Sequence, residues 1–355
     1  MTPFPAFDHA MMRRALALAE RGLYTATPNP RVGCVLTQGE RVVGEGWHEK
    51  AGGPHAEVLA INEAGTKAAG ATLYVTLEPC NHHGRTPPCT DLIVRNRIKR
   101  VVAAVRDPNP EARHGGESLA AAGVRFEHGL LEEEARELNI GFFSRLTRGR
   151  PWVRMKIAAT LDGRTALADG RSQWITGPEA RRDGHLWRAR ACAILTGIGT
   201  VKVDDPRLTV REVDTPRQPL RVVVDSRLEI AACAKVLEGG NALIFTGAAG
   251  KAPGGVETVH LPNAQGKVDL PKMLAELARR GVNELHVEAG FRLNGSLVRE
   301  GCVDELLLYL NPSLLGDGAQ GMLDLPALDS LARRTRVKIR SWERIGEDLR
   351  IVART

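Results

Sequence analysis

Short apolar runs that suit β-strands alternate with helical stretches along the 355 residues of this chain. The alternation stops at a Gly/Pro break, Arg148-Gly149-Arg150-Pro151, and a new strand-like run begins at Trp152. A chain of this length exceeds the size at which one hydrophobic core usually suffices. We therefore expect two α/β domains, one over residues 1–147 and the other over residues 151–355.

Five strands are expected in the first half, and the first two form a hairpin around a Gln38-Gly39 turn. The predicted strands span 32–37, 41–47, 72–77, 100–105 and 124–127. Helices are predicted over 7–22 and 132–146, with two others that start near His55 and near Pro88.

The second half alternates strands with helices more regularly, which is typical of a largely parallel sheet. Strands are predicted at 152–158, 193–196, 220–225, 242–246, 284–288 and 305–310. The clearest helices are predicted at 179–190, 270–280 and 293–300.

The composition excludes several classes of protein. With 43% hydrophobic and 26% charged residues, the chain is neither disordered nor fibrous. No apolar run approaches the roughly 18 residues of a membrane span, and the N-terminus lacks a signal-peptide pattern, so we expect a cytoplasmic protein without a membrane partner. The net charge of +7 is scattered and aromatic residues make up only 4%, which favours phosphorylated small molecules over nucleic acid as partners. The oligomeric state stays open, and a homo-oligomer is one possibility.

One histidine and two cysteines have the pattern of a zinc site. His55-Ala56-Glu57 is followed by Pro79-Cys80 and, after eight intervening residues, by Cys89. One imidazole and two thiolates suit zinc and leave its fourth position open for water. Glu57 can take a proton from that water and deliver it to a departing amine, as in zinc deaminases with the signature His-x-Glu and Pro-Cys-x-x-Cys. The longer cysteine spacing meets this signature only in part. The other cysteines are expected to be reduced core residues: Cys34, Cys192, Cys233 and Cys302.

A structural zinc site is the alternative interpretation of the same three residues. Such a site would recruit a fourth protein ligand, and His82 or His83 is available for this role. The three ligands are, however, predicted at the carboxyl ends of strands or the starts of helices, where open α/β sheets build their functional sites. This placement favours catalysis.

Three longer motifs in the first half resemble the deaminase half of the bifunctional RibD family of riboflavin biosynthesis. They are Thr27-Pro-Asn-Pro-Arg-Val-Gly-Cys-Val, Gly52-Gly-Pro-His-Ala-Glu and Thr76-Leu-Glu-Pro-Cys-Asn-His-His-Gly-Arg-Thr-Pro-Pro-Cys. The resemblance implies a cytidine-deaminase-like three-layer α/β/α domain in which His55, Cys80 and Cys89 bind zinc and Glu57 shuttles protons. It also accounts for the long cysteine spacing and implies that Asn29 and His48 line the pocket. The implied reaction is hydrolytic loss of the 2-amino group from a diaminopyrimidinone that carries ribose 5-phosphate. One departure is His114, which stands where the family commonly has glycine and leaves the conformation of that loop open.

Two glycine-containing turns in the second half are candidates for phosphate binding. The run Glu288-Ala-Gly-Phe-Arg-Leu-Asn-Gly-Ser follows a strand and opens a helix, whose free amides bind phosphate well. The run Gly197-Ile-Gly-Thr-Val lacks the complete Gly-x-Gly-x-x-Gly pattern. Ordinary turns explain either motif equally well. Asp204-Asp205 fits a magnesium pair or a turn before Pro206.

The second half also resembles the reductase half of the RibD family, whose fold is similar to that of dihydrofolate reductase. The motifs are Met155-Lys-Ile-Ala-Ala-Thr-Leu-Asp-Gly-Arg, Ser172-Gln-Trp-Ile-Thr, Gly197-Ile-Gly-Thr-Val-Lys-Val-Asp-Asp-Pro-Arg-Leu-Thr and Glu288-Ala-Gly. By this resemblance, the residues that contact NADPH are Ala158, Trp174, Thr200, Asp204, Ser226, Gly290, Phe291, Arg292, Leu293, Asn294, Gly295 and Ser296. Those that contact the substrate are Ser172, Arg188, Leu208, Arg211 and Glu288.

The implied chemistry is hydride delivery to C1 of the ribosyl group, which becomes ribityl. Arg188 and Arg211 can clamp a phosphate with forked hydrogen bonds, and Lys156 is a candidate to face the sugar. Taken alone, each arginine would more often be a solvated surface residue, and Trp174 would more often be a core residue. The sequence shows no protein general acid, so we expect positioning of the nicotinamide to supply most of the rate. The residues alone do not distinguish NADPH from NADH.

Two other functions share parts of this pattern. A nucleic-acid deaminase, such as a tRNA adenosine deaminase with a C-terminal binding module, would share the zinc site and would bind RNA with strong salt dependence. A zinc-stabilised scaffold that binds a nucleotide would have a closed metal site and no NADPH turnover. The reductase-like motifs and the few aromatic residues favour the bifunctional enzyme.

Overall fold

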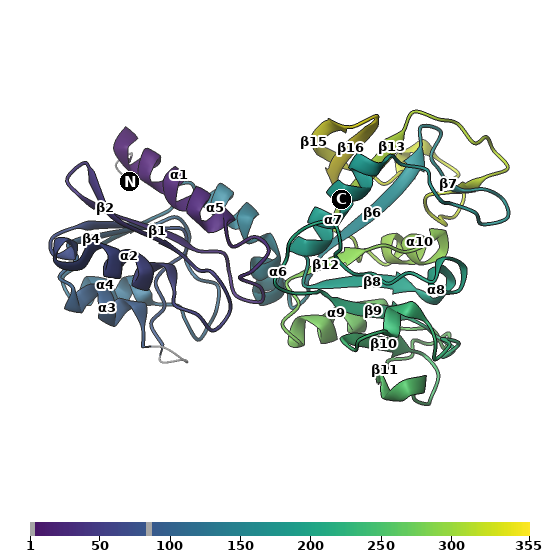
Figure 1. Cartoon of the computed structure of the whole chain (residues 1–355), viewed down its shortest axis with the longest axis horizontal. Coiled ribbons are helices and arrows are strands. Elements are labelled where there is room, and N and C mark those ends of the chain that lie inside the picture. The colour runs from purple at the N-terminus through teal and green to yellow at the C-terminus, as the bar shows by residue number, and fades with distance from the viewer. Residues whose placement is uncertain (1–3, 83–86) are drawn as a thin grey trace. The chain divides into compact units, whose positions relative to one another are not determined.

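The computed structural model of the protein describes residues 4–82 and 87–355. The chain divides into two compact units, residues 1–148 and residues 149–355, which lie in the purple-to-blue and teal-to-yellow parts of Figure 1. Within the described residues, no helix combines the length and the apolar character that a membrane crossing requires.

The first unit is built on a mixed β-sheet. Within residues 4–82 and 87–148 the strand order is β2-β1-β3-β4-β5, with β1 antiparallel to both neighbours and β3, β4 and β5 parallel to one another. The strands are β1 (Gly33–Gln38), β2 (Arg41–Trp47), β3 (Thr72–Val75), β4 (Arg100–Ala103) and β5 (Arg125–His128). The helices are α1 (Ala6–Glu20), α2 (Ala56–Ala64), α3 (Cys89–Arg95), α4 (Gly115–Ala121), α5 (Glu132–Leu138) and α6 (Ile140–Arg148), with a 3-10 helix at Gly65–Ala68.

Each face of this sheet has its own hydrophobic core, because successive strand residues point to opposite faces. Cys34 and Leu36 pack in one buried cluster with residues of α2, α3 and α4. Val35 packs in a second cluster with residues of α1, α5 and α6. Gly33 lets α1 approach closely, since a Cβ atom there would lie 2.0 Å from the carbonyl oxygen of Ala15. The result is the three-layer α/β/α arrangement that the family resemblance implies.

The helix predicted over 132–146 is interrupted. The structure has α5 and α6 with Asn139 between them. The buried Asn139 side chain accepts a hydrogen bond from the Arg31 amide and donates one to the Arg31 carbonyl, both at 2.8 Å. These bonds to a residue 108 positions away explain the break, which local helical periodicity does not reveal. The short helix α4 was also missing from the sequence prediction.

The second unit contains a larger sheet, and all of its residues, 149–355, are described. The strand order is β11-β10-β9-β8-β12-β6-β13-β16-β15. Its strands are β6 (Trp152–Thr160), β8 (Ala193–Gly197), β9 (Leu220–Val224), β10 (Ala242–Thr246), β11 (Glu257–His260), β12 (Glu284–Val287), β13 (Glu305–Asn311), β15 (Lys338–Ile345) and β16 (Asp348–Arg354), while β7 (Arg164–Ala166) and β14 (Gln320–Gly321) pair separately. The helices are α7 (Pro178–Arg190), α8 (Ile198–Asp204), α9 (Leu270–Arg279) and α10 (Phe291–Arg299), with 3-10 turns at Lys235–Leu237, Pro253–Gly255 and Leu331–Arg333.

The strands from β11 to β13 run parallel, and β16 and β15 continue the sheet antiparallel. The predicted largely parallel sheet is therefore confirmed. Helices α9 and α10 pack on one face with the largest core cluster, whereas α7 and α8 contribute to clusters on the other face. The hairpin of β15 and β16 was not predicted, because charged residues and exposed apolar residues obscure its alternation.

Candidate functional site

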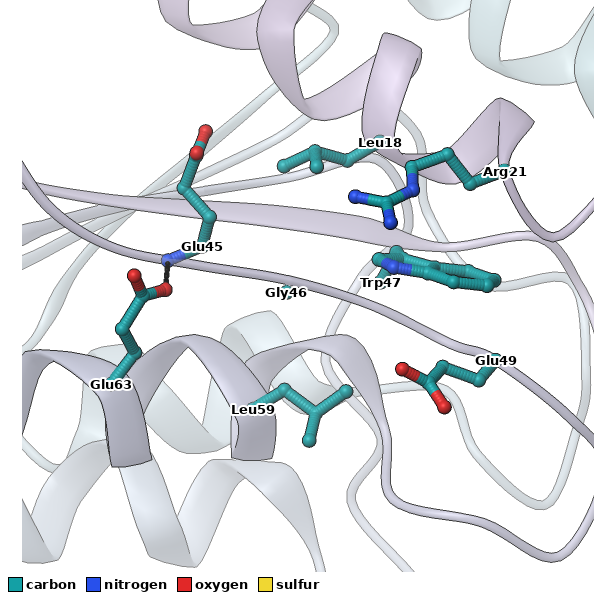
Figure 2. A pocket seen from close by; sticks show the side chains of 8 residues that line it. All are labelled: Leu18, Arg21, Glu45, Gly46, Trp47, Glu49, Leu59 and Glu63. Carbon is teal, nitrogen blue, oxygen red and sulfur yellow. Dashed lines mark hydrogen bonds between the residues drawn. The ribbon is translucent and has the colours of Figure 1, made fainter.

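A cavity of about 430 Å³ lies between α1, β2 and α2 in the first unit (Figure 2). Its lining residues are Leu18, Arg21, Glu45, Gly46, Trp47, Glu49, Leu59 and Glu63. The Arg21 guanidinium lies 5.0 Å from the centre of the Trp47 ring, and Glu63 accepts a hydrogen bond of 2.7 Å from the Glu45 amide. None of the site residues predicted from the sequence lines this cavity, and its three glutamates do not favour a phosphorylated ligand.

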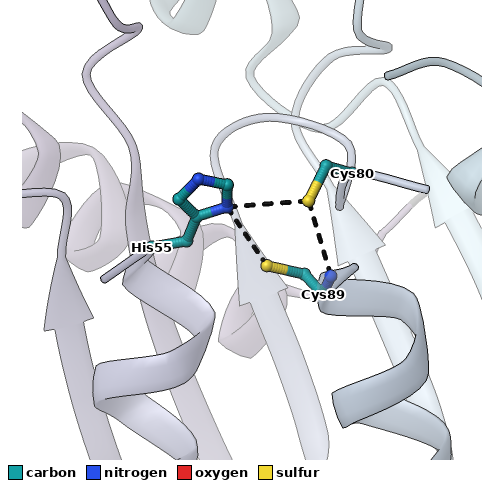
Figure 3. A group of neighbouring side chains, drawn as sticks. All are labelled: His55, Cys80 and Cys89. Atoms are coloured by element: carbon teal, nitrogen blue, oxygen red, sulfur yellow. Dashed lines mark hydrogen bonds between the residues drawn. The ribbon is translucent and has the colours of Figure 1, made fainter. Parts of the chain in front are cut away.

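The predicted zinc ligands lie together elsewhere in the same unit (Figure 3). The ligand atoms of His55, Cys80 and Cys89 all lie within 4.8 Å of one another, and within residues 4–82 and 87–355 no other group of three such ligands is so placed. His55 immediately precedes α2, Cys89 is the first residue of α3, and Cys80 lies in the loop that follows β3. The site therefore sits at the amino ends of two helices beyond the carboxyl end of a strand, as expected for an open α/β sheet.

Hydrogen bonds already favour a thiolate at this site. The Nδ1 atom of His55 lies 3.3 Å from Sγ of Cys89 and 3.6 Å from Sγ of Cys80, and the Cys89 amide donates to Sγ of Cys80 at 3.4 Å. Hydrogen bonding from the Cys89 thiol, assisted by His55, lowers the pKa of Cys80 to about 4. One imidazole nitrogen and two sulfur atoms at these separations are a donor set that fits zinc.

Glu57 lies in the first turn of α2, two residues after His55. Its side chain is buried, with 3% of the residue exposed, and burial raises the pKa of its carboxyl group above the ordinary value. A buried carboxyl group of raised pKa beside a metal site is suited to accept and return a proton near neutral pH.

His82 and His83 were the two candidates for a fourth zinc ligand. His82 does not belong to the group of three ligands, although its Nδ1 atom is buried without a hydrogen-bond partner among the described residues. His83 lies outside the described residues. The described donor set therefore supplies three protein ligands, which is the number found in catalytic zinc sites.

Asn29 and His48 lie beside the zinc ligands. The ring of His48 packs edge-on against that of His55, with centres 5.6 Å apart. Nδ1 of His48 lies 2.9 Å from the carbonyl oxygen of Pro54, and Nε2 lies 3.0 Å from Nδ2 of Asn29. A carbonyl oxygen can only accept, so Nδ1 carries the proton and Nε2 accepts from the Asn29 amide. This chain of hydrogen bonds fixes the orientation of the Asn29 side chain.

The loop that contains His114 packs against the cysteine segment. His114 has φ 72°, which is the left-handed conformation that glycine adopts most easily. The loop thus keeps a glycine-like backbone although histidine occupies the position. Nearby, Asp107 is a residue whose role the sequence did not indicate. Burial, together with Glu78 and Cys80, raises the pKa of its carboxyl group to about 7.

In the second unit, Glu288 and Arg188 form a bidentate ion pair. Nη2 of Arg188 lies 2.8 Å from Oε2 of Glu288, Nε contacts Oε1, and Nη1 donates to the Thr209 carbonyl at 3.0 Å. Lys156 on β6 is partly buried, and its ammonium lies 5.7 Å from the centre of the Tyr309 ring. Arg211 donates its backbone amide to His185 at 3.3 Å and a guanidinium N–H to the Thr209 hydroxyl at 3.1 Å. Arg188 is therefore held by Glu288, which the prediction of two arginines clamping a phosphate did not anticipate.

Four predicted cofactor residues, Ser226, Arg292, Leu293 and Ser296, line one cavity of about 130 Å³ that runs along one side of α10. Its lining residues are Val224, Ser226, Asn263, Lys267, Val268, Leu270, Arg292, Leu293, Ser296 and Glu300. Gly290 lies beside Thr200 of α8, since a Cβ atom at Gly290 would be in van der Waals contact with the Thr200 hydroxyl at 3.4 Å. The Oδ1 atom of Asn294 is buried without a hydrogen-bond partner among the described residues. A helix start with glycine, serine and basic side chains fits a phosphorylated cofactor.

Trp174 and the two aspartates Asp204 and Asp205 do not line this cavity. Trp174 is 71% exposed and lies under the Arg181 guanidinium, so it is not a core residue. Asp204 ends α8, and Asp205 caps that helix and pairs with Lys235 at 3.1 Å. The two aspartates thus lie at a helix end and the turn that follows it, which agrees with the turn predicted before Pro206.

Two family models match this chain. Residues 151–351 match the model described as RibD C-terminal domain, and residues 5–105 match the cytidine and deoxycytidylate deaminase zinc-binding region. The chain belongs to the RibD family. It is 45% identical to the riboflavin biosynthesis protein RibD of Escherichia coli K12, covering 96% of this chain and 98% of that protein. The RibD protein of Aquifex aeolicus is 43% identical, covering 96% and 97%.

Solved RibD structures share the fold over nearly the whole chain. Acinetobacter baumannii RibD (form 2) has a TM-score of 0.91 at 39% identity, and the Thermotoga maritima diaminohydroxyphosphoribosylaminopyrimidine deaminase/5-amino-6-(5-phosphoribosylamino)uracil reductase has a TM-score of 0.89 at 35% identity. Both comparisons cover 98% of each chain. The protein is thus a bifunctional deaminase and reductase of riboflavin biosynthesis, with a cytidine-deaminase-type zinc-binding domain followed by a dihydrofolate-reductase-like domain. Neither the nucleic-acid deaminase nor the zinc-stabilised scaffold agrees with RibD family membership.

Proposed function

We propose that the first unit deaminates 2,5-diamino-6-(5-phosphoribosylamino)pyrimidin-4(3H)-one by zinc-dependent hydrolysis. The second unit then reduces the ribosyl group with NADPH, giving 5-amino-6-(5-phosphoribitylamino)uracil. The observation that carries this proposal is the group His55, Cys80 and Cys89, whose ligand atoms lie within 4.8 Å of one another beside the buried Glu57. The Thermotoga maritima relative is named for the same pair of activities, a deaminase and a reductase.

In the deaminase unit, His55, Cys80 and Cys89 would hold zinc and Glu57 would move the protons. When bound there, zinc supplies a Lewis acid that makes a water molecule acidic near neutral pH. The carboxylate of Glu57 accepts a proton from the attacking water and then donates it to the leaving amino group. Its raised pKa suits both steps, because the group can hold the proton between them.

Asn29 and His48 would orient the pyrimidine beside these groups. Because His48 accepts a hydrogen bond from Asn29, the amide oxygen of Asn29 stays available to accept from an amino group of the substrate. His48 is held in this role by Pro54, and burial lowers the pKa of the imidazole, which keeps it neutral. Asn29 and His48 would thus select a pyrimidine ring that presents a hydrogen-bond donor to the Asn29 oxygen.

In the reductase unit, NADPH would lie along the starts of α8 and α10. The residues proposed to contact it are Ala158, Trp174, Thr200, Asp204, Ser226 and the turn from Gly290 to Ser296. NADPH supplies the hydride when bound. The cavity lined by Ser226, Arg292 and Ser296 supports the contacts on the α10 side of this placement.

The substrate would lie against Ser172, Leu208, Arg211 and Glu288. Since Glu288 holds Arg188, we assign the principal phosphate contact to Arg211 and give Arg188 the role of fixing Glu288. Lys156 faces the sugar from β6 on the same side of the sheet as these groups. Positioning of the sugar carbon for hydride transfer then supplies most of the rate.

The test is a two-step assay on the zinc-loaded, full-length enzyme. Ammonia release from the diaminopyrimidinone should need no NADPH, and NADPH oxidation should begin only after deamination. The Glu57→Gln variant should release no ammonia yet should still reduce the predeaminated substrate, with zinc content unchanged. Oxidation of NADPH ahead of deamination, or undiminished ammonia release by this variant, would refute the proposal.

A homo-oligomer is supported by an exposed apolar segment of the reductase unit. β15 is an edge strand of the large sheet, and seven of its eight residues are exposed. Large exposed apolar side chains lie on β15 and on the segment before it: Leu325, Leu328, Leu331, Val337, Ile339 and Trp342. Native proteins rarely leave such an edge uncovered, so we propose that a second copy covers it. Trp342→Glu should lower the mass measured by light scattering to that of one chain, and an unchanged mass would contradict this assignment.

A cytoplasmic location fits the cysteines. The structure describes all six and shows none in a disulfide, as expected in a reducing compartment.

A further inference from the structure

One face of the reductase sheet buries a row of charged side chains beneath α7. Strand β12 and the residue after it place Glu284, His286 and Glu288 on this face, because strand residues two apart point the same way. On the neighbouring strand β6, Arg154 pairs with Glu284 at 3.1 Å and stacks on Trp187 of α7 at 4.5 Å from the ring centre. The row leads toward Glu288, which the proposed function places against the substrate.

His286 is the member of this row that neither the sequence motifs nor the proposed mechanism uses. None of its surface is exposed. Neither of its ring nitrogens has a hydrogen-bond partner among the described residues, and the nearest acceptor is Oε1 of Glu288, 3.3 Å from Nε2. A buried imidazole nitrogen without a partner is costly, so the position of this side chain calls for a compensating role.

The contact defines which nitrogen of His286 carries the proton. Burial lowers the pKa of the imidazole, so the ring is neutral and has a single N–H. The Glu288 carboxylate is ionised: burial alone would raise its pKa, but Arg188 holds that pKa well below the ordinary value. A carboxylate can only accept hydrogen bonds, and the proton therefore belongs on Nε2.

The two oxygen atoms of Glu288 are then inequivalent. Oε1 faces two donors, Nε of Arg188 and Nε2 of His286, whereas Oε2 receives Nη2 of Arg188 at 2.8 Å. Oε2 keeps more free acceptor capacity, since a carboxylate oxygen has two lone pairs. Neutral His286 thus acts through this one polar contact of 3.3 Å and leaves the net charge around Glu288 unchanged.

Other charged and titratable groups surround this pair and stay constant when His286 is replaced. They are Arg154 and Lys156 on β6, His185 and Arg188 on α7, Arg211 in the loop beyond α8, and Tyr309 on β13.

We propose that His286 is a positioning residue of the reductase site, which holds Oε1 of Glu288 so that Oε2 is the oxygen presented to the ribosyl substrate. The assignment rests on the proposed reductase function. It predicts that an apolar residue at this position leaves Glu288 charged and still paired with Arg188 but removes the second polar contact that orients Oε1. The loss of activity should then appear in kcat, through the step that needs an oriented Glu288 carboxylate.

The test compares His286→Leu with His286→Gln in the full-length enzyme, using predeaminated substrate and NADPH. The leucine variant should lose about 10- to 100-fold in kcat, the loss expected for one hydrogen bond to a charged group, while KM and NADPH affinity stay near wild type. The glutamine variant retains an N–H donor and should recover kcat to within about threefold of wild type. Equal losses in both variants, or an unchanged kcat in the leucine variant, would overturn the assignment.

A second measurement does not depend on turnover. In wild-type enzyme with ¹⁵N-labelled histidine, the signals that are lost in the His286→Gln spectrum should show a protonated Nε2 and an unprotonated Nδ1. A proton on Nδ1 would overturn the assignment. Should wild-type enzyme fail to oxidise NADPH, the proposed function fails, whereas the tautomer still reports on the contact with Glu288.

Discussion

Replacement of Arg154 by methionine should destabilise the reductase unit selectively. Arg154 is 2% exposed, and its guanidinium lies between the carboxylates of Glu284 and Glu305, at 3.1 and 2.5 Å. Removing one member of a buried ion pair costs about 3 to 5 kcal/mol, because the partner charge stays buried. Each carboxylate keeps a second arginine partner. Glu284 keeps Arg190 at 2.7 Å, and Glu305 keeps Arg354 at 3.3 Å. We therefore expect a loss near the lower end, about 3 kcal/mol.

For a unit of this size, about 3 kcal/mol corresponds to a fall in Tm of roughly 6 to 12 °C. The assay is scanning calorimetry, supported by the two residual activities after brief heating. Reductase activity should be lost at a lower temperature than in wild type, whereas ammonia release should survive as before.

The matched control is Arg14→Met, which breaks the exposed ion pair of Arg14 with Glu45 in the deaminase unit. Exposed pairs contribute about 0 to 1 kcal/mol, so this variant should unfold almost like wild type. The triple variant Arg154→Met, Glu284→Gln and Glu305→Gln should recover part of the stability, since the two buried carboxylates that lost Arg154 are then neutral amides, although Arg190 and Arg354 lose their carboxylate partners. An Arg154→Met variant that unfolds at the same temperature as the control would refute this reasoning.

Three further outcomes follow from the geometry of the two units. Cys80→Ser should reduce bound zinc, measured by metal analysis, and abolish ammonia release while reduction of predeaminated substrate continues; full zinc retention would contradict the ligand assignment. Burial lowers the pKa of His185 to about 4, so the folded reductase unit binds fewer protons than the unfolded chain and loses stability as pH falls from about 6.5 toward 4. His185→Gln should flatten that pH dependence in denaturant titrations, and an unchanged slope would rule out His185 as its source. Gly33→Ala should destabilise the deaminase unit by about 1 to 3 kcal/mol or more, because the new methyl group would collide with the Ala15 carbonyl, and a stability equal to wild type would disprove that close approach.

The parts of the fold that depend on local pattern were predictable from the sequence. Strand runs such as 220–225 and 305–310 are apolar because they lie in the interior of the large sheet, and the structure has strands there. The zinc ligands were also predictable, since donor type and spacing define the site chemically, and the structure brings them within 4.8 Å.

The parts that depend on distant contacts were not predictable. The break at Asn139 depends on hydrogen bonds to Arg31, and the pairing of Arg188 with Glu288 joins residues 100 positions apart. Neither contact leaves a periodic signal in the sequence. Strand β15 was missed for a different reason, because an exposed edge strand lacks the alternation that burial of one face imposes. His286 carries no motif, and only its burial against Glu288 marks it.

X-ray absorption at the zinc edge of the full-length enzyme tests the central claim most directly. The account predicts one zinc per chain with two sulfur ligands at about 2.3 Å and two lighter ligands at about 2.0 Å, one from His55 and one from water. Substitution of His82 and His83 by alanine should leave this spectrum unchanged. A third sulfur ligand, or a spectrum that changes when these histidines are removed, would mean a closed site and would contradict the proposed deaminase mechanism.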